Sequence, residues 1–343
     1  MTVILGLESS CDDSAAALVT SDRRILAQAV VGQNGAHQPY GGVVPEIAAR
    51  AHVEILPSLI QKVLHEAGMP IGDVDAVAAT AGPGLVGGVM VALLAGKGLA
   101  LAAGKPLLAV NHLEGHALSP RLSDPGLSFP YLLLLVSGGH CQLLEVRGAG
   151  EYRRLATTID DAAGEAFDKA AKLLGLAYPG GPAIEELAKL GDPTAVPLPR
   201  PLVGSGEPHF SFAGLKSAVQ RAVASDDFRN EDIAASFQQA VVDCLVDRTA
   251  IALRNSDTHA LVVAGGVAAN QVIRAALADL AQRDGRRFSV PPQWLCTDNA
   301  AMIAWAGVER LAAGYRDSLD APARARWPLD ESADRVRGAG IKA

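Results

Sequence analysis

The apolar positions of the chain fall into short runs that end in polar, glycine-rich turns. Three segments share this pattern: residues 3–7 before 8–14, residues 131–136 before 137–140, and residues 260–264 before 265–270. In the first two segments a further apolar run follows directly, at 15–19 and at 142–146. A strand, a tight turn and a second strand predict a β-hairpin in each case.

The third segment continues differently. The apolar side chains of Val272, Ile273, Ala276, Leu277 and Leu280 recur at helical spacing, which predicts an amphipathic helix over residues 271–280. A strand, a glycine turn and a helix N-terminus in succession form a natural site for an anion.

One apolar stretch, residues 84–104, is long enough to imitate a membrane span. It carries Lys97 in its interior, contains many glycines and lacks a basic flank, so we predict a buried core helix. The N-terminal run of residues 3–7 meets Glu8 without a preceding basic region. It therefore reads as a first strand, not as a signal peptide.

The chain has 343 residues, more than a typical single core accommodates, so we expect two lobes. The two hairpins begin at residues 3 and 131, which suggests that the lobes are related and face a cleft. The tail after Pro322, with Arg324, Arg326, Arg335 and Arg337, reads as loosely packed.

Charge and cysteine content narrow the classes of function. The formal net charge is −7, and an acidic surface does not by itself indicate nucleic-acid binding. A polyanion would have to meet a local basic patch or a patch on a partner. The four cysteines form no CxxC pair, which favours reduced thiols in a cytosolic protein.

His112 and His116 stand four residues apart. On a helix they share one face, roughly 6 Å apart along the axis, where two imidazoles can hold one Zn²⁺ or Fe²⁺ ion. Two ordinary surface histidines are the alternative. A zincin protease is not favoured, because Leu113 stands where that motif needs glutamate and Glu114 would point away from the pair.

A metal site needs a third ligand. Asp298 lies just before a predicted helix over residues 300–312. Its carboxylate could complete the site, or it could simply cap that helix.

Two glycine turns, 137–139 and 265–266, could bring backbone N–H groups to phosphate oxygens. No P-loop motif of the form GxxxxGK[ST] occurs. The polar region 160–169, followed by the rigid loop 178–182, could hold ribose hydroxyls or an amine; a solvated helix face with a salt bridge is the alternative. The segment 210–216 adds Phe210, Phe212 and Lys216, which equally suit a core pair and a surface cation.

Taken together, these motifs resemble the TsaD family, the tRNA N6-adenosine threonylcarbamoyltransferases. The similarity runs from Val3 to about Leu329 and is carried by residues 5–14, 41–46, 81–85, 111–116, 136–140, 160–169, 178–182, 210–216, 264–270 and 296–301. The resemblance implies an α/β protein of the actin-like ATPase fold, with two related lobes around a central nucleotide-binding cleft. Lobe I would comprise residues 1–130 and 298–330, lobe II residues 131–297, and a flexible tail residues 331–343.

The resemblance also implies an activity. The threonylcarbamoyl group of threonylcarbamoyl-adenylate would pass to N6 of adenosine 37 in tRNAs that read codons beginning with adenine, and AMP would be released. Carried over residue by residue, His112, His116 and Asp298 would be the metal ligands. The substrate contacts would be Leu135, Val136, Ser137, Gly138 and Gly139 in the phosphate loop, and Asp168, Gly181, Glu185 and Asn270 elsewhere. One departure concerns Asp13, where the family often has glutamate, so no catalytic role is assigned to it.

The implied cofactor is one divalent ion, Fe²⁺ or Zn²⁺, with ATP or ADP and Mg²⁺ left open. The implied partners are tRNA, a paralogous TsaB-type subunit and a TsaE-type ATPase, in the cytoplasm and without a membrane. We expect neither a protein nucleophile nor a covalent intermediate. An ATP-dependent small-molecule kinase of the same fold is the alternative enzyme, and a catalytically silent scaffold is the alternative without activity.

Overall fold

The computed structural model describes residues 1–40, 42–334 and 336. The chain divides into two compact units. Unit 1 comprises Met1–Gly126, Gly148–Glu151 and Thr297–Glu331, and unit 2 comprises Leu127–Arg147, Tyr152–Cys296 and residues 332–334. Of the residues expected in motifs or in the arginine-rich tail, Gly41, Arg335 and Arg337 lie outside the described part.

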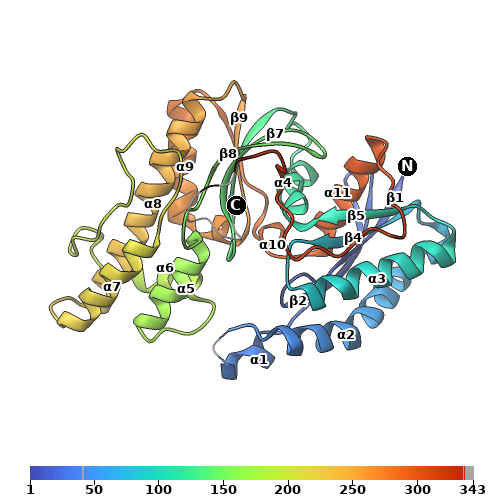
Figure 1. Cartoon of the computed structure of the whole chain (residues 1–343), viewed down its shortest axis with the longest axis horizontal. Coiled ribbons are helices and arrows are strands. Elements are labelled where there is room, and N and C mark those ends of the chain that lie inside the picture. Colours follow the sequence, from blue (N-terminus) through green and yellow to red (C-terminus); the bar gives the residue numbers. More distant parts are fainter. Residues whose placement is uncertain (41, 335, 337–343) are drawn as a thin grey trace. The chain divides into compact units, whose positions relative to one another are not determined.

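Unit 1 contains one five-stranded sheet in the order β3-β2-β1-β4-β5 (Figure 1). Its strands are β1 (Val3–Glu8), β2 (Asp13–Thr20), β3 (Ile25–Gly32), β4 (Ala76–Gly82) and β5 (Leu107–Asn111). Its helices are α1 (Asn34–His37), α2 (Pro45–Glu66), α3 (Val86–Ala103), α4 (His112–Ser123) and α11 (Ala300–Ala312), with 3₁₀ turns η1 (Gln38–Tyr40) and η2 (Ile71–Asp73).

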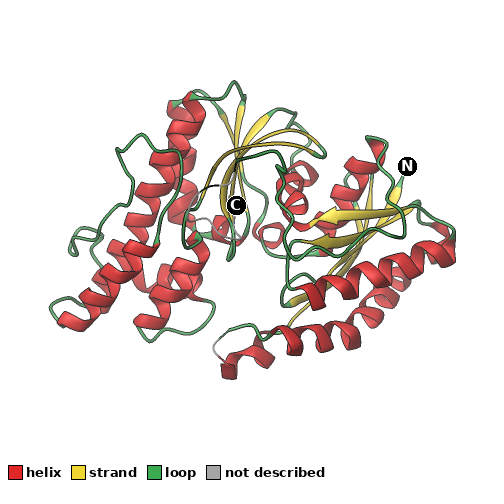
Figure 2. Ribbon diagram, in the orientation of Figure 1, coloured by secondary structure: helices red, strands yellow, loops and turns green. Residues whose placement is uncertain are grey.

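Unit 2 repeats this plan with the strand order β10-β9-β6-β7-β8. Its strands are β6 (Tyr131–Val136), β7 (Cys141–Gly148), β8 (Glu151–Thr157), β9 (Ala260–Ala264) and β10 (Arg287–Ser289). Its helices are α5 (Ala163–Leu173), α6 (Gly180–Ala188), α7 (Ala213–Ser225), α8 (Asn230–Arg254), α9 (Gln271–Arg283) and α10 (Gln293–Cys296), with the 3₁₀ turn η3 (Gly266–Ala269) (Figure 2).

The central strands β1 and β6 occupy equivalent places in the two sheets. Each pairs antiparallel with the strand that follows it and parallel with a strand that comes later in the chain, β4 or β9. Both predicted hairpins, β1–β2 and β6–β7, are therefore confirmed. The third predicted segment is also present, because β9 leads through η3 into α9.

Helices cover both faces of the unit 1 sheet. Successive side chains of a strand point to opposite faces, so Leu5 and Leu7 pack in one apolar cluster with Leu56 of α2, while Gly6 faces α11. A Cβ atom at Gly6 would lie 2.4 Å from the carbonyl oxygen of Ala300. Only a glycine allows α11 to lie this close to β1, and Asp298 stands two residues before the start of α11.

The prediction of a buried core helix over residues 84–104 is right for only one face of α3. Gly88, Val89, Ala92, Leu93, Gly96 and Ala100 are buried, and Gly96 allows the helix to approach Ala79 of β4. Val86, Met90, Leu94 and Leu101 on the other side are 45–68% exposed. By length and composition α3 could cross a membrane, although core helices of soluble proteins also pass that test.

The expectation of a loosely packed tail after Pro322 is wrong as far as Glu331. Residues 316–331, here called the C-terminal strap, belong to unit 1. Backbone hydrogen bonds join Arg324 to Ala81 and Ala325 to Gly84. Ala321, Ala323 and Trp327 also pack on a small apolar cluster of the same unit. The strap satisfies backbone groups at the ends of the sheet, which a run rich in proline and arginine does not reveal in sequence.

Candidate functional site

Two histidines enter the candidate metal centre from the start of α4. β5 ends at Asn111, whose side-chain oxygen accepts a hydrogen bond from the Leu113 N–H at 2.9 Å and so caps the helix. His112 is the first residue of α4, and His116 follows one turn later on the same face. The sequence thus directs both imidazoles to one point by ending a buried strand in a helix cap.

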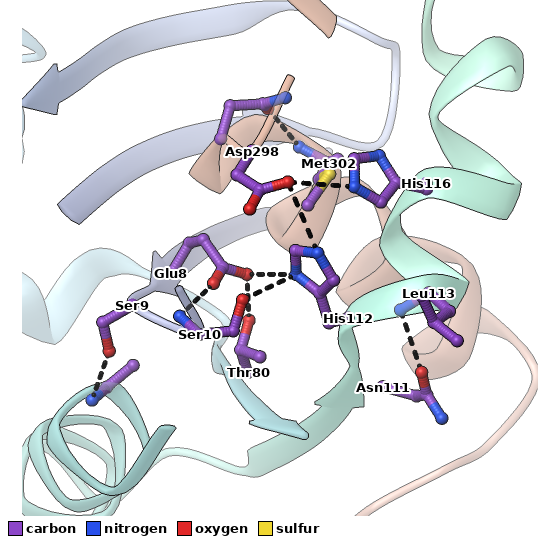
Figure 3. A network of polar contacts seen from close by, with 12 residues as sticks. Glu8, Ser9, Ser10, Thr80, Asn111, His112, Leu113, His116, Asp298 and Met302 are labelled. Carbon is purple, nitrogen blue, oxygen red and sulfur yellow. Dashed lines mark hydrogen bonds and ion pairs between the residues drawn. The ribbon is translucent and has the colours of Figure 1, made fainter. Parts of the chain in front are cut away.

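Asp298 reaches the same point from the segment before α11. The cap of α11 is Asn299, whose side chain accepts from the Met302 N–H at 2.9 Å. The interpretation of Asp298 as a plain capping residue is therefore wrong. Because its neighbour caps the helix, the Asp298 carboxylate is free to turn toward the histidines (Figure 3).

The three side chains converge. One oxygen of Asp298 lies 3.1 Å from Nε2 of His116 and 3.4 Å from Nε2 of His112, and the three ligand atoms all lie within 4.8 Å of one another. The imidazole rings stand edge to face, with centroids 4.8 Å apart. Two imidazole nitrogens and one carboxylate oxygen form a donor set that suits Zn²⁺ or Fe²⁺ and leaves positions open for a substrate.

The electrostatics of this cluster suit a cation. Burial alone would raise the pKa of Asp298, but the charge of His112 and its hydrogen bond hold that pKa well below its ordinary value. Burial would likewise lower the pKa of His112, while the charges of Asp298 and Glu8 raise it well above its ordinary value. A bound divalent ion would take over the role of the imidazolium proton in balancing these carboxylates.

Glu114 lies between the two histidines in sequence, as a glutamate does in zinc proteases, but it takes no part in this cluster. It is 1% exposed, and its oxygens bind Arg310 at 3.1 Å and the Gly150 N–H at 2.8 Å. Its carboxylate is committed to holding α4 to neighbouring backbone and to α11. This placement agrees with the prediction that Glu114 points away from the histidines.

In unit 2, the two glycine turns meet. β6 and β9 are parallel neighbours, so both chains leave the sheet at the same edge. A Cβ atom at Gly265, whose φ is +95°, would lie 2.4 Å from the carbonyl oxygen of Val136. The Gly164 N–H at the start of α5 donates to the carbonyl oxygen of Ser137 at 3.3 Å. The N-terminus of α5 therefore lies next to the turn that contains Ser137.

Within the predicted phosphate loop the residues differ in accessibility. Leu135 and Val136 are completely buried, so their side chains serve the core. Ser137 closes the turn, since its N–H donates to the His140 carbonyl at 2.8 Å. A Cβ atom at Gly138 or Gly139 would meet nothing within 4 Å. The open backbone of these two glycines is the part of the loop that a phosphate could approach.

The four remaining predicted contacts lie on α5, on α6 and just before α9. A carboxylate oxygen of Asp168 on α5 accepts from the Gly180 N–H, which begins α6 beside Gly181, at 2.8 Å. Glu185 on α6 accepts from the N–H of Gln271 at 2.8 Å. Burial raises the pKa of Asp168.

Asn270, the neighbour of Gln271, caps α9 by accepting from the Ile273 N–H at 3.0 Å and donates to Gln238 of α8 at 2.8 Å. Unit 2 therefore brings Asp168, Gly181, Glu185 and Asn270 together through α5, α6 and α9. Other residues considered in the sequence analysis have structural roles. Lys169 pairs with Asp161 and Glu165, and Phe210 and Phe212 are core residues.

The sequence analysis missed Glu8. This residue ends β1 and its side chain is buried against His112. The one signal was its position, a carboxylate at the boundary between an apolar strand and a polar turn.

Solved structures identify the architecture. Component A of (R)-2-hydroxyglutaryl-CoA dehydratase from Acidaminococcus fermentans matches 91% of this chain and 100% of its own with a TM-score of 0.55 and 18% identity. Full-length HypF matches 91% of this chain and 46% of its own with a TM-score of 0.59 and 13% identity. The two-sheet α/β plan is thus the actin-like ATPase fold, here with a histidine and aspartate cluster that could hold a metal ion.

Sequence comparison gives the family. The model described as "TsaD: tRNA N6-adenosine threonylcarbamoyltransferase" matches residues 24–305. Relatives with that enzyme name are 72% identical in Sphingopyxis alaskensis and 66% identical in Novosphingobium aromaticivorans, each over 100% of both chains. The chain belongs to the TsaD family, which confirms the resemblance.

Proposed function

We propose that this chain transfers the threonylcarbamoyl group from threonylcarbamoyl-adenylate to N6 of adenosine 37 in tRNAs that read codons beginning with adenine. The observation that carries the proposal is the full-length similarity to relatives named for this transfer. The kinase alternative is not favoured by those relatives. A silent scaffold would have no need of a converged His112, His116 and Asp298.

The reaction is an acyl-type transfer. The N6 amine attacks the carbamoyl carbon, the bond from that carbon to the adenylate oxygen breaks, the amine loses a proton, and AMP leaves. An aromatic amine is a weak nucleophile, so positioning of the two substrates must supply much of the rate. We assign no protein nucleophile and no covalent intermediate.

The residues of unit 2 would hold the donor. The N–H groups of Gly138 and Gly139 would face the adenylate phosphate and stabilise charge on it as AMP departs. Asp168 and Asn270, fixed by their own hydrogen bonds, would contact the nucleoside, with Gly181 and Glu185 beside them. The side chains of Leu135 and Val136 would act only by supporting this loop.

In unit 1, His112, His116 and Asp298 would hold one divalent ion, Fe²⁺ or Zn²⁺, which when bound would act as a Lewis acid on a donor oxygen. Because the net charge is −7, we infer that this chain does not bind tRNA alone. A TsaB-type subunit and a TsaE-type ATPase would complete the tRNA-binding assembly. We place this assembly in the cytoplasm. Binding of ATP or ADP with Mg²⁺ stays open within the proposal.

The test combines the protein, threonylcarbamoyl-adenylate, TsaB-type and TsaE-type partners and tRNA, followed by digestion to nucleosides and mass spectrometry. We expect threonylcarbamoyl-adenosine and AMP with the wild type, loss of both with His112→Ala, and retention with His65→Ala, a matched change at an exposed histidine of α2. ADP with a phosphorylated small molecule would overturn the proposal. A threonylcarbamoylated side chain in a reaction without tRNA would refute the direct transfer.

A further inference from the structure

The Glu8 carboxylate contacts Nδ1 of His112, whereas Asp298 lies nearest to Nε2 of the same ring. Glu8 is the last residue of β1, and its side chain is 0% exposed. Three groups meet its two oxygens: the backbone N–H of Ser10 at 2.5 Å, the hydroxyl of Thr80 at 2.5 Å and Nδ1 of His112 at 3.0 Å (Figure 3). Neighbouring strands β1 and β4 supply this pocket, so its geometry is part of the sheet.

The hydrogen-bond partners of Glu8 require its side chain to present hydrogen-bond acceptors, including toward His112. The Ser10 N–H can only donate, and the Thr80 hydroxyl donates to the same oxygen that faces the imidazole. A carboxylate with two oxygens that only accept satisfies all three groups. An amide of the same shape would turn an NH₂ group toward at least one donor.

This arrangement separates the two nitrogens of His112. Nδ1 faces Glu8 at 3.0 Å and the Ser10 hydroxyl, which can also accept, at 3.1 Å, whereas Nε2 faces Asp298 at 3.4 Å. An acceptor at Nδ1 keeps the proton there and leaves the lone pair of Nε2 for the metal, because the hydrogen bond of one ring nitrogen determines the state of the other.

The second histidine lacks such support. His116 is 1% exposed, and its Nδ1 has no hydrogen-bond partner among the residues that the structure describes. The centre is therefore asymmetric, with one ligand fixed by a buried carboxylate and the other fixed only by packing and by Asp298.

We propose that Glu8 is a positioning residue that holds His112 as an Nε2 ligand and thereby sets the metal affinity of the centre. The proposal rests on the metal centre named under the proposed function, but not on the reaction catalysed there. Glu8 is not itself catalytic, because a side chain that is 0% exposed touches no substrate.

The decisive measurement is the Zn²⁺ dissociation constant of the full-length protein, obtained by competition with a chromophoric chelator. We expect Glu8→Gln to weaken Zn²⁺ binding about 10- to 100-fold, the usual effect of losing such a partner. Glu309→Gln is the matched control, because Glu309 is a carboxylate on α11 that binds Arg121 of α4 at 2.7 Å, away from the centre. It should leave the Zn²⁺ affinity unchanged.

His112→Ala separates the two levels of the argument. If His112→Ala abolishes Zn²⁺ binding while Glu8→Gln leaves it within about twofold of the wild type, well short of the usual range, the role of Glu8 is refuted and the centre stands. If His112→Ala also leaves binding unchanged, the metal centre itself is refuted. The transferase assay is not needed for either decision.

A second measurement needs no Glu8 variant. In the Zn²⁺-loaded wild type labelled with ¹⁵N-histidine, long-range proton–nitrogen NMR spectra report which ring nitrogen carries the proton, and His112→Ala identifies the signal. We expect His112 to be protonated at Nδ1 and metal-bound at Nε2. A proton on Nε2, or metal on Nδ1, would overturn the proposal even if Glu8→Gln did not fold.

Discussion

Gly180 donates its backbone N–H to the carboxylate of Asp168 across 2.8 Å, and this contact fixes the start of α6 against α5. The approach depends on the missing side chain. A Cβ atom at Gly180 would lie 2.7 Å from Cα of Asp168 and 2.9 Å from the carbonyl oxygen of Phe167. Real Cβ atoms do not come so close to backbone, so the two helices would have to separate.

Gly180→Ala should therefore destabilise the protein by about 1–3 kcal/mol, the usual cost of overpacking. It should also weaken binding of the adenylate, because Asp168 loses its fixed partner. Gly181→Ala is the matched control for stability, since a Cβ atom there meets nothing within 4 Å. Urea unfolding of both variants is the measurement, and equal free energies of unfolding would contradict the tight contact.

Gly164 supports the glycine turn in the same manner. A Cβ atom at this position would lie 2.7 Å from the carbonyl oxygen of Ser137 and 2.8 Å from Cα of Gly138. Gly164→Ala should displace the turn and weaken AMP binding by about tenfold or more, which corresponds to about 1.4 kcal/mol. Gly214, the second residue of α7 as Gly164 is of α5, has open space around it. In calorimetric titrations, Gly214→Ala should bind AMP with the affinity of the wild type. An equal loss of AMP affinity in both variants would argue against the turn as the phosphate site.

Asp13 gives a prediction about pH. Burial raises its pKa from 3.8 to about 7, and the charges of Asp298, Asp12 and Glu8 contribute. The unfolded chain therefore loses this proton near its ordinary pKa, while the folded protein keeps it until about pH 7. Between these two pH values the Asp13 carboxyl is ionised in the unfolded chain but still protonated in the folded protein. A rise in pH through this range therefore favours unfolding, and the wild type becomes less stable.

Asp13→Asn removes that group, so its melting temperature relative to the wild type should rise from about pH 4 to about pH 7 and then level off. Differential scanning fluorimetry in the presence of a chelator measures this difference without a metal ion that would compensate the carboxylates. A difference that does not change with pH would show that Asp13 ionises normally in the folded protein.

The sequence predicted those parts of the fold that follow from a local pattern. Short polar turns separate the apolar runs that form β1 and β2, and those that form β6 and β7. Two strands joined by so short a turn can hardly pair with anything but each other. The spacing of His112 and His116 likewise specified a shared helix face. Asp298 could be chosen as their partner only through the resemblance, because its capping role and its ligand role have the same signature in sequence.

Other features had no local signal. Apart from Lys97, α3 is apolar on all sides, so its pattern gave little sign that Leu94 and Leu101 face outward. The C-terminal strap has no periodicity because it is held by single backbone hydrogen bonds and a few scattered side-chain contacts, not by a repeating apolar face. The role of Glu8 could not be predicted, because it depends on the hydrogen-bond donors around the buried carboxylate. Two of these donors, Thr80 and His112, are far from Glu8 in sequence.

The strap leads to the last prediction, because it reaches the start of α4, which carries His112 and His116. The side chain of Asn111 uses both ends of its amide: Oδ1 caps α4 through the Leu113 N–H, and Nδ2 donates to the carbonyl oxygen of Trp327 at 3.0 Å. Asn111→Ala removes both bonds, whereas Asn111→Ser keeps a good capping oxygen but is too short to serve the strap.

We expect Asn111→Ala to lower the free energy of unfolding by about 1 kcal/mol more than Asn111→Ser, which is the usual value of a helix cap. Both variants should loosen the strap equally, so limited proteolysis near Trp327 should speed up to the same extent in each. The two measurements separate the cap from the strap. Equal stability of the two variants would mean that Asn111 does not cap α4, and unchanged proteolysis in both would mean that the strap is held without it.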